Sequence, residues 1–168
     1  MTVTSNIDPS VFRAVLGHAP TSVVVVTGYN AEGRPFGITI GSFVSVSLDP
    51  PLVGFLPGTS SNSWKAISES GKFCVNILGA DQEDLCWRFA KEGDDKFSGV
   101  DWTDTPSGNP MLMGVIGVID CTIEAEHVMG DHYFVVGRVV ELSHAHDVQQ
   151  AMVFFRGKVV SATYPSPS

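Results

Sequence analysis

The sequence has 168 residues, of which 43% are hydrophobic and 17% are charged. This length corresponds to one domain, and the composition is that of a globular protein, which excludes a disordered chain. Lys and Arg number 10 against 18 Asp and Glu, giving a net charge of −8. Such a surface repels phosphate backbones, which argues against a nucleic-acid partner. An anionic small ligand must therefore be held by local donors.

The three cysteines, Cys74, Cys86 and Cys121, fit neither a zinc site nor a dense disulfide framework by their spacing. We therefore expect no metal and a reducing compartment. The first ten residues lack the basic and apolar segments of a signal peptide. The longest nearly uncharged run, residues 37–48, is too short to span a membrane. These features predict a cytoplasmic protein with no membrane segment.

The first predicted element is a helix over residues 9–16. Asp8 can cap it, Pro9 suits its first position, and apolar residues at 11, 12, 15 and 16 form one stripe. Apolar, β-branched runs between turn signals predict strands over residues 23–29, 36–48, 52–56, 72–78, 115–127, 132–142, 151–155 and 158–163. Further short helices are predicted over residues 64–70 and from a cap at Asp81 to about residue 91, and residues 103–110 are expected to form a loop.

Seven or eight strands with turn signals every ~8–12 residues favour a mainly β fold, either an antiparallel barrel or a sandwich, with a few short peripheral helices. Residues 23–29 and 36–48 are expected to pair through the turn at residues 30–35. No repeat or linker divides the sequence. We therefore expect a single domain over residues 1–168, with a core from about 12 to 160 and a frayed tail over 164–168.

The segment from Gly37 to Ser47 combines hydroxyl side chains with two glycines. Strand alternation, if no bulge intervenes, puts the following residues on one face: Thr39, Gly41, Phe43, Ser45 and Ser47. Glycine admits close approach to the backbone, and hydroxyls offer uncharged donors and acceptors. The segment suits a flat ring with a polar edge, although a hydroxyl-rich strand that faces solvent has the same pattern.

Three other segments bear polar or cationic groups that could hold a ligand. The hydroxyl-rich residues 57–64 precede a helix start, which favours an anion but is equally typical of a capping loop. Arg88-Phe89 and Lys96-Phe97 each pair a cation with an aromatic ring, as ligand contacts or as salt bridges and core packing. His132 begins a strand after Gly130-Asp131, where an imidazole can serve either a structural or a functional role.

In this order, the segments resemble the short-chain flavin reductases, the reductase components of two-component flavin-dependent monooxygenases. The resemblance covers residues from about 12 to 158. The segments that carry it are Gly37–Pro51, Phe73–Leu78, Arg88-Phe89, Lys96–Gly99, Gly130–His132 and Phe154–Lys158. It implies a split β-barrel of the Greek-key, FMN-binding type, assembled as a homodimer with the flavin near the subunit interface.

The resemblance also implies site residues. Those expected along the flavin ring are Thr39, Ile40, Gly41, Ser42 and Phe43, with Ser45 on the same strand. Those expected toward the ribityl chain and phosphate are Pro57, Gly58, Thr59, Ser63, Trp64, Arg88, Phe89, Lys96 and Phe97. His132 would face the nicotinamide as the catalytic residue, and the residues expected to bind NAD(P)H beside it are Phe155, Arg156 and Gly157. Relatives commonly carry Ser, Thr, Asn or Gln at the position of Gly41, whose lack of a side chain leaves flavin N5 to a backbone amide or water.

The implied function is hydride transfer from NADH or NADPH to FMN or FAD, followed by delivery of reduced flavin to a monooxygenase. This chemistry needs no nucleophile or strong base from the protein, because the flavin and nicotinamide supply the reactive atoms. Two alternatives keep the flavin but change the role: a protein that reduces another substrate, and one that only binds or carries flavin. A barrel that carries a different apolar molecule is a further alternative.

Overall fold

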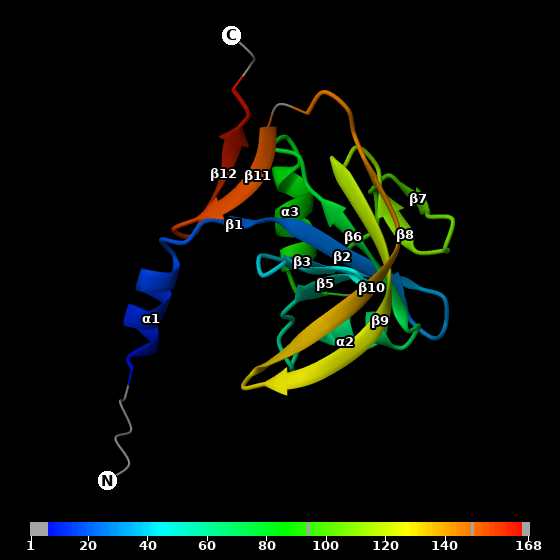
Figure 1. The fold of residues 1–168 in the computed structure, drawn as a ribbon, viewed down its shortest axis with the longest axis horizontal. Helices are drawn as coiled ribbons and strands as arrows, with labels where there is room; N and C mark the ends of the chain where they lie inside the picture. The colour runs from blue at the N-terminus through cyan, green and yellow to red at the C-terminus, as the bar shows by residue number, and fades with distance from the viewer. Residues whose placement is uncertain (1–6, 94, 149, 166–168) are drawn as a thin grey trace.

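The computed structural model describes residues 7–93, 95–148 and 150–165, and over these residues the protein is mainly β with three short helices (Figure 1). The helices are α1 Pro9–Leu16, α2 Asn62–Ser68 and α3 Glu83–Ala90. The strands are β1 Thr21–Ser22, β2 Val24–Tyr29, β3 Pro35–Ile40, β4 Val44–Leu48, β5 Pro51–Phe55, β6 Lys72–Ile77, β7 Trp102–Asp104, β8 Pro110–Leu112, β9 Gly117–Met129, β10 His132–His144, β11 Gln150–Phe155 and β12 Lys158–Thr163. The predicted mainly β class is confirmed.

Helix α1 forms where the sequence predicts it. The carboxylate of Asp8 accepts a hydrogen bond from the backbone N–H of Ser10 at 2.7 Å, which caps the helix. All eight residues of the helix are exposed, because α1 extends away from the body of the molecule (Figure 1). Its end is held in place at Gly17, whose carbonyl accepts from the N–H of Arg156 at 2.9 Å.

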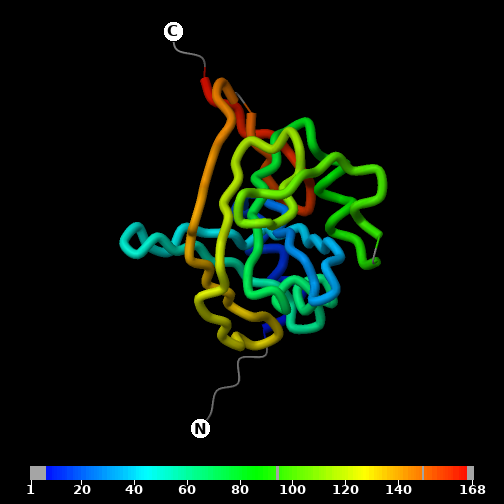
Figure 2. The backbone as a smooth tube through the Cα atoms, turned by 90° about the vertical axis from the view of Figure 1, so that its right-hand side faces the viewer, coloured from blue at the N-terminus to red at the C-terminus, as the bar shows by residue number. Residues whose placement is uncertain are grey.

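The order of strands in the main sheet decides where the barrel opens. Seven antiparallel strands pair in the order β3-β2-β6-β9-β10-β5-β4, so that β3 and β4 are its opposite edges. In a flat sheet, six spacings of about 4.8 Å would separate these edges by roughly 29 Å. Yet the four Cα steps from Ile40 to Val44 reach at most about 14 Å. The sheet must therefore curl into a barrel that is split between β3 and β4 (Figures 1 and 2).

The prediction of one strand over residues 36–48 was wrong. β3 pairs with β2 as expected, but the chain breaks at residues 41–43 and β4 pairs with β5 across the split. The register of β4 also shifts between Ser45 and Ser47. The expected common face of Thr39, Gly41, Phe43, Ser45 and Ser47 is therefore not formed, because both the break and the shift interrupt the two-residue alternation.

The core has two parts, one on each side of the curled sheet. Inside the barrel, the rings of Phe55, Trp64 and Phe73 meet edge to face at centroid distances from 5.1 to 6.0 Å. The second part lies under α3, where Phe89 and Phe97 pack at 5.1 Å. Aromatic pairs in this geometry add about 0.5–1.5 kcal/mol each beyond the area they bury. These contacts fix α2 and α3 against the sheet.

Smaller differences from the sequence prediction concern the ends of elements. Asp81 does not cap α3: Gln82 occupies the capping position, and its side chain accepts from the N–H of Gly79 at 3.0 Å. The expected loop over 103–110 is flanked by the short strands β7 and β8, which pair with each other. Of the expected tail, residues 166–168 lie outside the described residues. Within the described ranges, no helix is long and apolar enough to cross a membrane.

Candidate functional site

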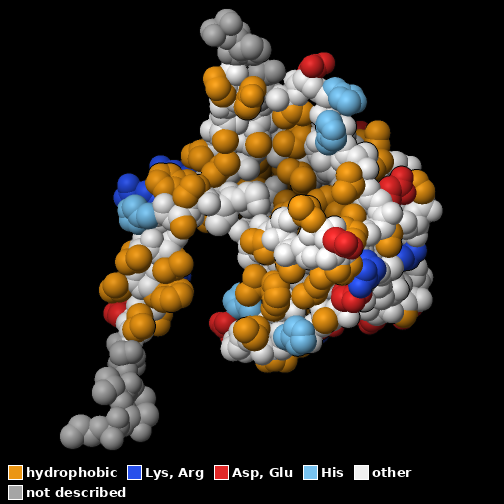
Figure 3. All heavy atoms as spheres, in the orientation of Figure 1, with side chains coloured by type: hydrophobic (Ala, Val, Ile, Leu, Met, Phe, Trp, Pro, Cys, Tyr) orange, Lys and Arg blue, Asp and Glu red, His pale blue; other side chains and the backbone are white. Residues whose placement is uncertain are grey.

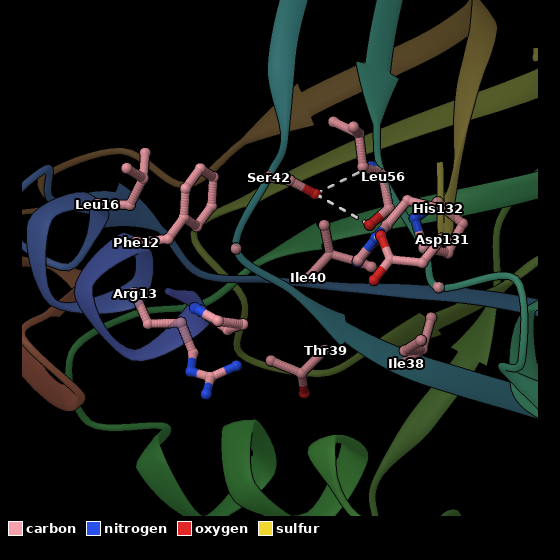
Figure 4. Close-up of a pocket in the computed structure, with 14 residues that line it drawn as sticks. Phe12, Arg13, Leu16, Ile38, Thr39, Ile40, Ser42, Leu56, Asp131 and His132 are labelled. Carbon is pink, nitrogen blue, oxygen red and sulfur yellow. Dashed lines mark hydrogen bonds and ion pairs between the residues drawn. The ribbon is translucent and has the colours of Figure 1, made fainter. Parts of the chain in front are cut away.

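A cleft of about 980 Å³ opens at the split of the barrel (Figure 4). Three walls enclose it: helix α1, the end of edge strand β3, and the loop after β5 together with the start of β10. The lining residues are Pro9, Phe12, Arg13, Leu16, Ile38, Thr39, Ile40, Gly41, Ser42, Leu56, Pro57, Gly58, Asp131 and His132. The walls are largely apolar, and polar groups lie along the rim.

The floor of the cleft is an edge strand. β3 bonds to β2 on one side, so alternate backbone N–H and C=O groups on its other side are available to a ligand. The chain leaves this strand at Gly41, and the Ser42 hydroxyl accepts from the N–H of Leu56 at 2.9 Å. This bond joins the two sides of the split at the point where the cleft begins.

The rim opposite α1 is built by hydrogen bonds between two loops. The N–H of Tyr133 donates to the carbonyl of Pro57 at 2.9 Å, and the N–H of Thr59 donates to the carbonyl of Asp131 at 2.9 Å. The Thr59 hydroxyl also donates to that Asp131 carbonyl, at 3.1 Å. The loop after β5 and the β9–β10 turn therefore hold each other in a fixed position.

His132 is oriented by its neighbour in sequence. Its Nδ1 lies 2.7 Å from the carboxylate of Asp131, and this hydrogen bond, with the charge of the imidazole, lowers the pKa of Asp131. A carboxylate accepts only, so Nδ1 carries the proton and Nε2 is left for a ligand. The side chain of His132 is 46% exposed. The imidazole can therefore meet a bound molecule at the rim.

Helix α1 supplies a wall that the sequence analysis did not identify. Phe12 and Arg13 point from the helix into the space in front of β3, and Leu16 lies one turn further along (Figure 4). The apolar stripe at positions 11, 12, 15 and 16 was the available signal, but it equally describes a helix that packs on a core. Ile38, Leu56 and Asp131 also line the cleft without having been expected there.

The structure brings seven of the nineteen residues expected to contact flavin or nicotinamide together at the cleft. The expected residues that line the cleft are Thr39, Ile40, Gly41, Ser42, Pro57, Gly58 and His132. Thr39 also directs its hydroxyl to the carbonyl of Cys86 in α3, at 2.7 Å. Phe43 packs against the barrel core, and Ser45 is exposed on β4.

The remaining residues expected around the ribityl chain are mostly buried beneath the cleft. The buried ones are Ser63, Trp64, Phe89, Lys96 and Phe97. Trp64 donates its indole N–H to Glu126 at 2.7 Å while its ring packs in the core, so its side chain is occupied within the protein. Before α2, the hydroxyl of Ser61 caps the helix by accepting from the N–H of Trp64 at 3.1 Å.

Lys96 joins three elements below the floor of the cleft. Lys96 is only 9% exposed. Its ammonium donates at 3.1 Å to each of three oxygens: the carbonyl of Gly37 in β3, the hydroxyl of Ser63 in α2 and the carbonyl of Phe89 in α3. Gly37 has no side chain where the Phe89 ring packs: a Cβ there would lie 2.5 Å from that ring. These contacts fix the position of β3 at the floor of the cleft.

Two other hollows contain the remaining expected residues. Arg88 lines one of about 490 Å³ between α3 and the following loop, and its guanidinium donates to the carbonyl of Ser98. Arg156 and Gly157 line one of about 410 Å³ beside α1, whereas Phe155 is half-buried at the end of β11. Arg13 lines both this last hollow and the cleft.

We expect Lys96→Met to destabilise the protein. The substitution leaves buried oxygens without their donor, at a cost of about 1–3 kcal/mol each, so the loss should reach about 3 kcal/mol or more. For a domain of this size that corresponds to a fall in Tm of about 6–12 °C, measured by calorimetry. Lys65→Met, which removes an exposed lysine from α2, is the matched control. Equal melting temperatures for Lys96→Met and the control would contradict this role.

Comparison with known proteins identifies the family. The flavin reductase like domain matches residues 16–163 of this chain. A flavin reductase of Pseudomonas putida is 48% identical over 155 residues, which cover 92% of this chain and 91% of that protein. The reductase subunit HsaB of a flavin-dependent monooxygenase from Rhodococcus jostii (strain RHA1) is 43% identical over 165 residues, which cover 96% of this chain and 84% of that protein.

A solved structure has the same fold. The NADH:FAD oxidoreductase SgcE6 of Streptomyces globisporus, in complex with NAD and FAD fragments, superposes with a TM-score of 0.87 at 31% identity, covering 96% of this chain and 98% of that one. The barrel split between β3 and β4 is thus the split barrel expected from the sequence. The chain belongs to the flavin reductase-like family.

Proposed function

We propose that this flavin reductase takes hydride from NADH, passes it to FMN or FAD in the cleft, and releases the reduced flavin to a partner monooxygenase. The observation that carries this proposal is the cleft at the barrel split, with an edge strand as its floor and an oriented imidazole at its rim. The sequence identity of 48% to a flavin reductase and of 43% to a monooxygenase reductase subunit supports the same activity. The flavin is then a substrate that binds and leaves.

The cleft suits a flavin ring in size and chemistry. Its volume of about 980 Å³ lies at the upper end of the range of about 300–1,000 Å³ that is typical of small-molecule sites. Phe12 and Leu16 offer apolar surface to the faces of a ring, and the free edge of β3 offers backbone donors and acceptors to its polar rim. At Gly41, which has no side chain to offer the ring, a backbone amide or a water molecule takes that part.

The protein contributes position and shielding to the reaction. When bound, the flavin accepts a hydride that the nicotinamide supplies. The walls of the cleft would position the flavin and nicotinamide rings against each other and shield them from water, since hydride transfer requires the reacting atoms within about 3–3.5 Å. Asp131 fixes the imidazole of His132, and we infer that Nε2 binds the carboxamide of the nicotinamide. Hydride transfer itself requires no side chain of the protein to move a proton.

We also infer a homodimer in which α1 and the β4–β5 hairpin meet the second copy. Both extend from the body of the molecule, the hairpin in cyan in Figure 2. Val11 and Val15 on α1 are 57% and 63% exposed, and Leu48 at the hairpin tip is 91% exposed. Exposed apolar residues on two protruding elements mark a surface for association.

We place this single-domain protein, residues 1–168, in the cytoplasm. Cys74, Cys86 and Cys121 are free thiols in the structure, although all three are buried. Burial raises the pKa of each thiol, that of Cys121 to about 12. Free thiols of this kind suit a reducing compartment.

The central test is anaerobic mixing of the purified protein with FMN or FAD and NADH, followed at the absorbance of oxidised flavin. We expect bleaching in multiple turnovers at a rate that rises with added flavin, because reduced flavin leaves the cleft. NADPH in place of NADH measures the coenzyme preference. A protein that binds flavin without bleaching is a flavin carrier, and bleaching of only one equivalent points to a reductase for another substrate; either result contradicts the proposal.

We expect His132→Ala to lower NADH-dependent turnover at least tenfold while flavin still binds. The substitution removes the rim contact to the nicotinamide but leaves β3 and α1 intact. Stopped-flow reduction and equilibrium flavin binding measure the two effects separately. His127→Ala, which removes an exposed histidine of β9, is the control. Unchanged steady-state kinetics in His132→Ala would exclude His132 from the mechanism.

We expect Val11→Glu/Val15→Glu to convert a dimer of 18.0 kDa chains into monomers. Two carboxylates on the apolar face of α1 would be buried without partners in the dimer. Light scattering after size exclusion measures the mass, and circular dichroism checks that the fold is kept. Ser10→Glu, on the first turn of the same helix, is the control for added charge. A wild-type protein that is monomeric at micromolar concentration would contradict the proposal.

A further inference from the structure

Strand β1, Thr21–Ser22, carries the chain from helix α1 to β2. Figure 3 shows the open space between this helix and the body of the molecule, and the chain crosses from one to the other through β1 (Figure 1). The strand pairs with β11, with Thr21 opposite Phe154. Val23, the residue that follows β1, is 2% exposed, which anchors the segment in the core. The fold therefore fixes the position of Thr21.

Gly41, which lines the cleft just after β3, leaves an opening toward β1. A Cβ at Gly41 would lie 3.2 Å from the hydroxyl oxygen of Thr21 and 3.9 Å from the carbonyl oxygen of Ser22. Apart from its neighbours in the chain, no other described atom would lie within 4 Å of it. The space beside Gly41 is therefore bordered by polar groups of β1 and is otherwise open. Glycine at a strand often marks such a close approach of another group to the backbone.

The hydroxyl of Thr21 differs from the other hydroxyls around the cleft, because those have partners in the protein. Thr39 and Thr59 donate to backbone carbonyls at 2.7 and 3.1 Å, and Ser42 accepts from a backbone N–H at 2.9 Å. Thr21 is half-buried, and in the part of the chain that the structure describes its hydroxyl forms no hydrogen bond. This hydroxyl is therefore available to a ligand.

A threonine hydroxyl suits the polar rim of a flavin ring. The rim bears carbonyl oxygens and ring nitrogens, and a hydroxyl can donate one hydrogen bond and accept others. Because the group is uncharged, its contact with the ring does not require a buried counter-ion. The β-branched side chain has few rotamers, so little conformational freedom is lost when the hydroxyl is held in one direction.

We propose that Thr21 is a further flavin-binding residue, whose hydroxyl bonds to the polar rim of the ring through the opening that Gly41 leaves. This inference rests on the proposed function, which brings a flavin ring to the floor of the cleft. The two residues then act together: the glycine keeps the space open, and the threonine supplies a hydrogen-bonding group at its far side. A side chain at residue 41 would cover that group.

The test is the Kd for riboflavin, measured by quenching of its fluorescence, because riboflavin has the flavin ring without a phosphate. We expect Thr21→Val to raise this Kd about three- to tenfold, as the loss of one neutral hydrogen bond does. Thr103→Val removes an exposed hydroxyl from β7 and is the matched control, with an expected change below twofold. Equal Kd values for the two variants would overturn the proposal.

Two further variants separate a hydrogen bond from a packing effect. Thr21→Ser keeps the hydroxyl, so it should bind riboflavin within twofold of the wild-type Kd; a loss as large as that of Thr21→Val would count against the contact. Gly41→Ala should weaken binding in the wild-type background but not further in Thr21→Val, because it covers the same hydroxyl. Additive losses would show that the two residues act separately, against the proposal. Circular dichroism checks that each variant keeps the fold.

Failure of this inference can be distinguished from failure of the proposed reductase activity. Riboflavin binding needs no NADH, so it decides the role of Thr21 whether or not the wild-type protein turns over. No binding of riboflavin by the wild-type protein would overturn the contact, while NADH oxidation with FMN would still decide the activity. Turnover with an unchanged Kd for riboflavin in Thr21→Val would refute the contact and leave the reductase activity in place.

Discussion

The constraint on which the structure depends is the short connection between the two edges of its main sheet. Three residues join β3 to β4, although five strands lie between them in the order of pairing. The chain can satisfy this only by curling the sheet until its edges approach, without pairing them. A closed barrel would have hidden the backbone groups of β3 in a ladder. The split keeps them available and places a cleft beside them, so the candidate site follows from the topology.

Keeping an edge strand open requires that something else hold it in position. The buried ammonium of Lys96 and the ring of Phe89 fix β3 from below, and the Ser42 hydroxyl ties its end to Leu56. On the rim, the loop after β5 and the β9–β10 turn are joined by backbone hydrogen bonds. Hydrogen bonds thus hold the cleft on two sides. Helix α1, exposed along its whole length, forms the third wall.

The sequence predicted where strands and helices form better than it predicted which strands pair with each other. Runs such as residues 23–29 and 72–78 are rich in β-branched and apolar residues, and strands form there. The break at residues 41–43 was missed because hydroxyls and glycines alternate through it without a proline or a charge to mark a turn. Pairing across the split depends on residues far apart in the chain, and periodicity carries no information about them.

The site was predicted unevenly for a similar reason. A motif shows which residue types occur together, but it does not distinguish a side chain that contacts a ligand from one that holds the contact in place. Thr39 and His132 reach the cleft, whereas Trp64 and Lys96 are buried behind it with protein partners. The same residue type can contact a ligand or support the site from behind. Burial of the side chain decides between these two roles, and the curl of the sheet determines which side chains are buried.

The arginine side chains likewise differ in whether they contact other groups of the protein. Arg138 pairs with Glu124, which offsets its charge, whereas Arg88 and Arg34 contact a carbonyl and an aromatic ring within the protein. Within the described residues, the guanidinium groups of Arg13 and Arg156, beside α1, have no hydrogen-bond or ion-pair partner.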